Sequence, residues 1–103
     1  MNRLDIRDEY APETVFDLLS DRSRIQILDA LYNQWYQTPE TPCLAFSELY
    51  AEVDIKDSGQ FTYHLNRLSG ILIDKRACGY TLTPLGIQCG TLVDQTDGTA
   101  RTQ

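Results

Sequence analysis

The sequence predicts a mainly α-helical domain with a small β-hairpin wing, the winged helix-turn-helix fold. The first observation is a pair of helical patterns, residues 47–53 and 58–69, which are separated by the short turn 54–56. The second is a pair of β-prone runs that follow at once, residues 71–76 and 80–82, with a glycine near the end of the intervening turn. Helix, turn, helix and hairpin in that order are typical of a winged helix.

Two further helices are predicted ahead of this unit. Residues 1–10 contain few apolar side chains and are expected to form a flexible N-terminus. A proline in the first turn opens a helix over about 12–19, and Ser20 or Asp21 caps a longer helix that reaches about residue 36. Apolar side chains recur in the longer helix at three- and four-residue spacing, at Ile25, Leu28, Leu31, Tyr32 and Trp35. This periodicity predicts the main buried helix of the domain.

The first helix of the helix-turn-helix follows a proline-marked loop at 37–43. Residues 44–46 are expected to add a short edge to the wing sheet. Ser47 is the predicted N-cap of helix 47–53, with an acidic residue, Glu48, in the first turn.

The second helix of the pair has start and stop signals and two distinct faces. Asp57 suits the N-cap with Gln60 at the capping-box position, and Gly70 supplies a left-handed stop. One face is apolar and carries Phe61, Leu65 and Leu68, and the opposite face carries Gly59, Gln60, Tyr63 and Arg67. The polar face is interpreted as a surface that reads a partner, with a merely solvated helix face as the alternative.

The last helix and the domain limits complete the prediction. Thr83 is the expected N-cap and Pro84 the first-turn proline of a helix that reaches about Val93. The winged helix is therefore assigned to residues 11–94, and the polar tail at 95–103 is expected to be disordered.

The charge distribution leaves the predicted helix and wing as the least acidic region. The chain of 103 residues has 9 basic and 15 acidic residues, a formal net charge of −6, whereas a domain that binds DNA is usually basic. Residues 56–76 hold four basic and two acidic residues, a local charge of +2. Many acidic residues and few lysines are expected in a cytoplasm with molar salt, where a Debye length of about 3 Å screens repulsion between an acidic protein and phosphates.

Composition argues against several other classes of protein. No apolar run is long enough to span a bilayer, so a cytoplasmic protein is expected. The three cysteines, Cys43, Cys78 and Cys89, form no Cys-x-x-Cys pair and are expected to be free thiols in a reducing compartment. Neither a catalytic set of side chains nor a metal-ligand cluster is present, so no enzymatic function, cofactor or metal site is predicted.

Four other side chains are candidates for special roles. His64, which borders the apolar stripe, is expected to form a phosphate contact or a core hydrogen bond rather than to act in catalysis. Trp35 and Tyr36 are expected to pack in the core rather than to form a ligand cage. Cys78 at the wing tip is a possible redox thiol, because Lys75 and a neighbouring arginine would favour its thiolate.

The sequence resembles the ArsR-type winged-helix transcriptional regulators over about residues 12–93. Residues 19–28, Leu-Ser-Asp-Arg-Ser-Arg-Ile-Gln-Ile-Leu, resemble the opening signature of that family. Residues 62–68, Thr-Tyr-His-Leu-Asn-Arg-Leu, resemble its recognition helix, and residues 79–86 resemble the end of its wing. The Asp-Ser-Gly-Gln-Phe run at 57–61 is similar to that of ArsR-like regulators of halophilic archaea.

This resemblance implies a homodimer, joined through the N-terminal and C-terminal helices, that binds double-stranded DNA and regulates transcription as a repressor. The recognition helix 58–69 would enter the major groove, and the wing 72–82 would lie on the backbone or in the minor groove. The residues implied to contact DNA are Lys56, Ser58, Gln60, Thr62, Tyr63, Arg67, Lys75 and Arg76. The Cys-x-Cys pair of metal-sensing members is absent from residues 47–53.

Two alternatives to a plain DNA-binding regulator stay open. The acidic composition favours a winged helix that serves as a protein–protein interaction module in a transcription complex. A metal- or redox-responsive repressor would change its DNA affinity when metal is added or when a thiol is oxidised, with Cys78 as the candidate sensor thiol.

Overall fold

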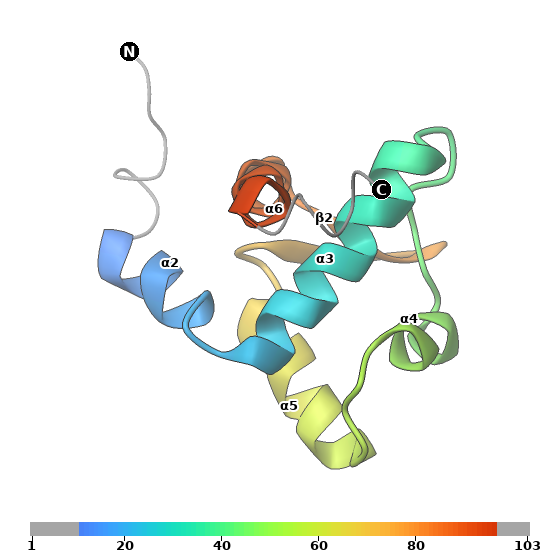
Figure 1. Ribbon diagram of the computed structural model, residues 1–103. Helices are drawn as coiled ribbons and strands as arrows, with labels where there is room; N and C mark the ends of the chain where they lie inside the picture. The colour runs from blue at the N-terminus through green and yellow to red at the C-terminus, as the bar shows by residue number, and fades with distance from the viewer. Residues whose placement is uncertain (1–10, 97–103) are drawn as a thin grey trace.

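The computed structural model describes residues 11–96 and has the predicted architecture, mainly helical with one two-stranded antiparallel hairpin (Figure 1). The elements follow the chain in the order α2 (Pro12–Leu18), α3 (Arg22–Gln37), α4 (Phe46–Glu52), α5 (Ser58–Leu68), β1 (Ile73–Arg76), β2 (Gly79–Leu82) and α6 (Pro84–Thr96). The winged helix-turn-helix fold predicted from the sequence is therefore confirmed. The N-terminus 1–10 and the tail from residue 97 lie outside the described residues.

Helix α3 is the central element of the domain, as its apolar periodicity predicted. It crosses the middle of the fold in Figure 1 and contacts α4, α5, α6 and β2. Its side chains Ile27, Leu28 and Leu31 are completely buried. They pack in one core with residues from every other element, among them Val15, Leu18, Leu49, Phe61, Leu65, Leu68, Leu72, Ile73, Leu82 and Cys89.

The wing is a short hairpin with a two-residue turn. β1 pairs with β2 in antiparallel register, from Ile73 opposite Leu82 to Arg76 opposite Gly79. Gly79 was expected in the turn but belongs to β2, so the tip consists of residues 77 and 78 alone. Its φ of +128° requires glycine, and a Cβ there would collide with the backbone of Leu44.

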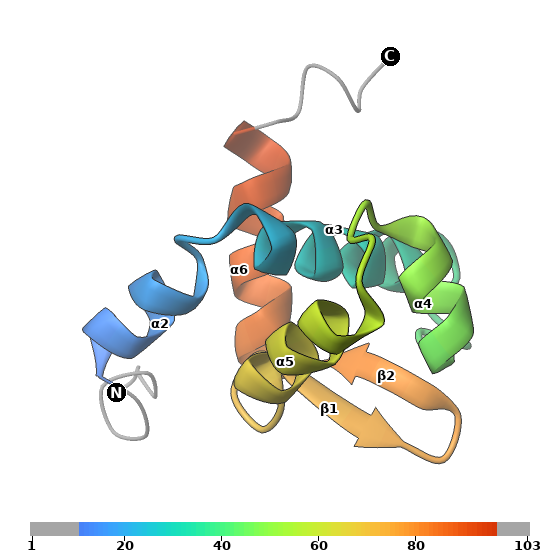
Figure 2. The same ribbon diagram turned by 90° about the horizontal axis from the view of Figure 1, so that it is seen from below.

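The predicted third edge of the sheet is reduced to one residue. Leu44 forms an isolated antiparallel bridge with Tyr80, in which each backbone N–H donates to the other residue's carbonyl, at 3.0 and 2.8 Å. This bridge holds the loop before α4 against the hairpin. The tip of the hairpin is therefore held against the rest of the domain. Helix α6 lies at the other end of the hairpin (Figure 2).

The helix caps agree with the sequence at two of three predicted positions in the middle of the chain. Asp21 caps α3 by accepting from the Ser23 backbone N–H at 2.8 Å, and Asp57 caps α5 by accepting from the Gln60 N–H at 3.1 Å. The prediction of Ser47 for α4 is wrong. That helix begins two residues earlier than a Ser47 cap requires, and its N-cap is Ala45, whose N–H donates to the Glu48 carboxylate at 2.8 Å.

The helix ends show one confirmed stop and one correction. Gly70 has a φ of +84°, as expected of a left-handed residue after α5. Thr83 caps α6 as predicted, because its hydroxyl accepts from the Gly86 N–H at 2.9 Å. However, α6 continues to Thr96, so residues 95 and 96, assigned to a disordered tail, belong to this helix.

The expectation of three free thiols is wrong. Cys43 and Cys78 form a disulfide, with their Cα atoms 5.8 Å apart, and Cys89 is the one free cysteine of the described residues. The Leu44–Tyr80 bridge brings the two partners together across 35 residues of sequence. Burial of Cys89 raises the pKa of its thiol. The inference of a reducing compartment therefore loses its basis.

The cap of α3 leads to a prediction about acid stability. Desolvation raises the pKa of Asp21, but the N–H donors of Ser23 and Arg24, with the nearby positive charge of Arg24, lower the pKa more, so the net shift is downward. A lowered folded pKa means that the carboxylate stabilises the fold above its unfolded pKa of about 3.9 and loses this effect as pH falls further.

We therefore expect the advantage of wild type over Asp21→Asn, at most about 1 kcal/mol, to be full above about pH 5 and to vanish as the pH falls toward 2. Urea unfolding of both proteins between pH 2 and 6 measures this difference. A difference that stays constant across this range would contradict the assigned cap.

Candidate nucleic-acid interface

The polar face of α5 is open to solvent while its apolar face is buried. Phe61, Leu65 and Leu68 lie in the core, as the stripe in the sequence predicted. All eight side chains expected to contact DNA are on the surface, namely Lys56, Ser58, Gln60, Thr62, Tyr63, Arg67, Lys75 and Arg76. Tyr63, with 51% of its surface exposed, points outward as expected. The candidate face is thus accessible to a partner along the whole helix.

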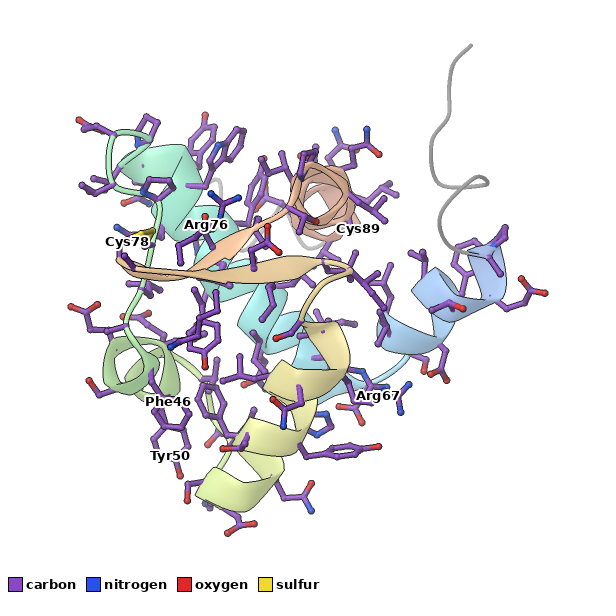
Figure 3. All side chains as sticks on the ribbon, turned by 180° about the vertical axis from the view of Figure 1, so that it is seen from behind. Phe46, Tyr50, Arg67, Arg76, Cys78 and Cys89 are labelled. Atoms are coloured by element: carbon purple, nitrogen blue, oxygen red, sulfur yellow. A yellow bond between two sulfur atoms is a disulfide. The ribbon has the colours of Figure 1, made fainter. Side chains whose placement is uncertain are left out.

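Aromatic packing fixes the angle between α4 and α5. The ring of Phe61 in α5 lies 4.8 Å from that of Tyr50 and 5.0 Å from that of Phe46, both in α4. Figure 3 shows Phe46 and Tyr50 side by side below α4. The Tyr50 hydroxyl also donates to the carbonyl of Lys56 in the turn, at 2.9 Å. These contacts make the helix-turn-helix a rigid unit that can present α5.

Arg67 is held by two hydrogen bonds at the C-terminal end of the exposed face. Its Nη1 donates to the Tyr63 hydroxyl at 3.2 Å, one turn earlier on α5. Its Nη2 donates to the carboxylate of Asp17 at 2.6 Å, which belongs to α2. The bonds to Tyr63 and Asp17 raise the pKa of Arg67. Figure 3 shows Arg67 between α5 and α2.

The two basic residues of the wing differ in their surroundings. Arg76 donates to the Asp74 carboxylate on the same strand at 3.3 Å, so part of its charge is compensated. The Lys75 ammonium lies 5.6 Å from the centroid of the Tyr80 ring on the paired strand. Arg76 and Cys78 lie at the same end of the hairpin in Figure 3. Because Cys78 is bonded to Cys43, it is not the exposed thiol that the sequence predicted.

A buried arginine supports α5 from behind, and this contact was not predicted from the sequence. Arg24 of α3 is only 6% exposed, and its Nη1 lies 3.1 Å from Nδ1 of His64 in α5. Since a guanidinium has only donors, Nδ1 is the acceptor, and the prediction of a core hydrogen bond for His64 is confirmed. Arg24 also donates to the carbonyls of Leu18 and Asp17, at 2.9 and 3.1 Å.

The two aromatic residues at the end of α3 have different environments. Trp35 packs against the core, and its ring lies 5.5 Å from that of Tyr32. The expectation of core packing is wrong for Tyr36, which is 69% exposed. Its ring stacks on the outer side of Tyr32 at a centroid distance of 6.2 Å, because the last turn of α3 offers no further layer to cover it.

Comparison with known families identifies the family of this chain. A profile described as a domain of unknown function, DUF7347, matches residues 12–93. The chain belongs to the DUF7347 family. The match extends over the helix-turn-helix, the wing and most of α6 of this DUF7347 domain. No curated protein and no solved structure matches the chain.

Residues 11–96 of the DUF7347 domain, the part that the structure describes, also bear on two other kinds of site. No helix in this part of the chain is long and apolar enough to cross a membrane. Among the same residues no three histidine, cysteine or acidic side chains are grouped in a way that could hold a metal ion. The ArsR-type resemblance stays a prediction.

Proposed function

We propose that this DUF7347 domain is a DNA-binding transcriptional regulator, acting as a repressor, whose helix α5 enters the major groove. The observation that carries the proposal is the placement of α5. It follows α4 in a helix-turn-helix held rigid by Phe61, and it exposes all of its polar side chains except the buried His64. The wing would then contact the backbone or the minor groove through Lys75 and Arg76.

The charges indicate that groove contacts outweigh simple phosphate attraction. Arg67 and Arg76 are each paired with a carboxylate, so a phosphate must compete with Asp17 or Asp74 for them. With a formal net charge of −6 for the whole chain, long-range attraction to DNA is weak. Side-chain contacts to base edges and the fit of the helix in the groove would supply the affinity.

A homodimer through α2 and α6 completes the proposal. Both helices carry large apolar side chains that the single chain leaves uncovered: Phe16 in α2 is 70% exposed and Leu92 in α6 is 60% exposed. A two-fold dimer through these helices would present two copies of α5 to a partly palindromic site. Sedimentation equilibrium at high salt measures the mass, and a strictly monomeric protein would contradict this part of the proposal.

Alanine substitutions on α5 test the proposed interface. We expect Gln60→Ala, Tyr63→Ala and Arg67→Ala each to weaken specific DNA binding by about 1–3 kcal/mol, because each removes a contact to a base edge or phosphate. The measurement is a fluorescence titration with a duplex selected by the wild-type protein from a random library, at several KCl concentrations at which the protein stays folded. Glu52→Ala, in α4 away from this face, serves as the matched control.

Chemical shifts of the labelled protein locate the interface independently. Shifts confined to residues 56–76 that fade as salt rises would support DNA binding through α5 and the wing, and the salt slope would count the phosphates. If no duplex causes shifts at any salt concentration at which the protein is folded, the regulator proposal fails. The acidic composition then favours the protein-interaction module, which should tolerate the α5 substitutions and depend on an apolar patch.

The disulfide favours a second candidate, a redox-responsive regulator. A dithiol reductant would break the Cys43–Cys78 bond, giving two thiols while the reductant becomes a disulfide. The wing tip would then lose its covalent link to the loop before α4. DNA affinity that differs between oxidised and reduced protein, but not in Cys78→Ser, would support this candidate.

A further inference from the structure

We propose that Asp17 is a positioning residue that orients Arg67 toward the edge of a guanine and thereby increases sequence specificity. This inference rests on the proposed function, because it assigns a role within the same DNA interface. The two residues are 50 positions apart in sequence and belong to different helices, α2 and α5. Their contact of 2.6 Å is therefore a product of the fold and not of local helix geometry.

The backbone carbonyl of Asp17 is held in place from the core side by Arg24. The buried Arg24 donates Nη2 to the carbonyl of Asp17 at 3.1 Å and Nε to that of Leu18 at 2.9 Å, at the C-terminal end of α2. The same guanidinium contacts His64 on α5. Arg24 thus sets the position of the Asp17 backbone relative to the recognition helix, and the Asp17 carboxylate extends from a fixed point toward Arg67.

Two hydrogen bonds orient the guanidinium of Arg67 and leave other N–H donors for a ligand. It has five N–H donors, of which one on Nη1 serves Tyr63 and one on Nη2 serves Asp17. Its side chain keeps 40% of its surface exposed. The remaining N–H groups can donate to neighbouring acceptors, and the O6 and N7 atoms of guanine are the pair that arginine commonly contacts in the major groove.

The carboxylate also selects between the two kinds of acceptor on DNA. The negative charge of Asp17 repels a phosphate that approaches Arg67, whereas the edge of guanine carries no net charge. A fixed arginine further loses less side-chain freedom on binding than a mobile one. Asp17 should therefore strengthen binding to the specific sequence and weaken binding to unrelated DNA.

Asp17→Asn tests this role with two duplexes of equal length, one selected by the wild-type protein from a random library and one of scrambled sequence. Affinity for the selected duplex should fall about tenfold, equivalent to the freedom of one long side chain. Affinity for the scrambled duplex should stay the same or rise up to about threefold, because one negative charge is lost. Glu13→Gln, also exposed on α2 but not in contact with Arg67, is the matched charge control and should lower neither affinity.

The outcomes that overturn the inference can be told apart. If Asp17→Asn binds both duplexes more tightly, Asp17 is a competitor of DNA. If it behaves like Glu13→Gln, only its charge matters. If Asp17→Asn does not fold, as judged by circular dichroism, Tyr63→Phe removes the other bond to Arg67 and should likewise weaken only the selected duplex. If the wild-type protein binds no duplex, the proposed function itself fails, and the inference fails with it.

Discussion

Breaking the Cys43–Cys78 disulfide is expected to lower the free energy of unfolding by about 4 kcal/mol. The bond closes a loop across 35 residues, which contains α4, α5 and β1. In the chain-entropy account, a cross-link of this span removes many conformations from the unfolded chain, and reduction restores them. For a domain of this size the loss corresponds to a fall in Tm of roughly 15–30 °C.

Thermal unfolding with and without a phosphine reductant measures the effect. The double variant Cys43→Ser/Cys78→Ser should have the Tm of the reduced protein in both conditions, and Cys89→Ser should still respond to the reductant. Amide exchange should accelerate locally as well, because Leu44 and Tyr80 donate to each other next to the broken bond. Three titratable thiols in the unreduced, denatured protein would contradict the disulfide.

The elements that could be predicted from sequence are those with local causes. Asp57 and Gly70 delimit α5 because a cap and a left-handed stop act within a few residues. The apolar stripe on α5 was identified for the same reason, since helical periodicity is a local property. The open polar face of α5 follows from that stripe, and the accessible candidate residues were predicted with it.

Most of the features that escaped prediction depend on contacts between distant segments. Cys43 and Cys78 meet only because the loop before α4 pairs with β2. The Ser47 error has a local origin, because serine is a better N-cap than alanine in general, and only the reach of Glu48 back to Ala45 reversed the preference.

Arg24 is the residue of the candidate site that sequence reasoning missed. Arginine is mostly exposed in proteins, and the acceptors that make its burial acceptable come from the end of α2 and from α5. One signal was available, because His64 borders the apolar stripe of α5 and a buried imidazole needs a hydrogen-bonding partner. The contact between Asp17 and Arg67 depends on the same packing of α2 against α5, so it could not be predicted from the sequence either.

The second large effect that we expect is a loss of stability when Arg24 is replaced. Arg24→Met should lower the free energy of unfolding by about 3 kcal/mol, because the carbonyl of Leu18 and Nδ1 of His64 lose the donor that Arg24 supplies. The carbonyl of Asp17 loses one donor too but still accepts from the N–H and hydroxyl of Ser20. A buried acceptor left without a partner costs about 1–3 kcal/mol, and water entering the space left by the side chain would replace part of the loss. The methionine retains most of the apolar volume, so the change isolates the hydrogen bonds.

Urea unfolding of Arg24→Met and Arg24→Lys distinguishes charge from geometry. Lysine keeps the positive charge, but one ammonium group cannot reach acceptors that surround a planar guanidinium. We therefore expect Arg24→Lys to be nearly as unstable as Arg24→Met. If lysine restores the wild-type stability, charge alone is sufficient there. If methionine costs less than about 0.5 kcal/mol, a value typical of surface substitutions, Arg24 does not join α2 to α5, and Asp17 has no fixed point from which to orient Arg67.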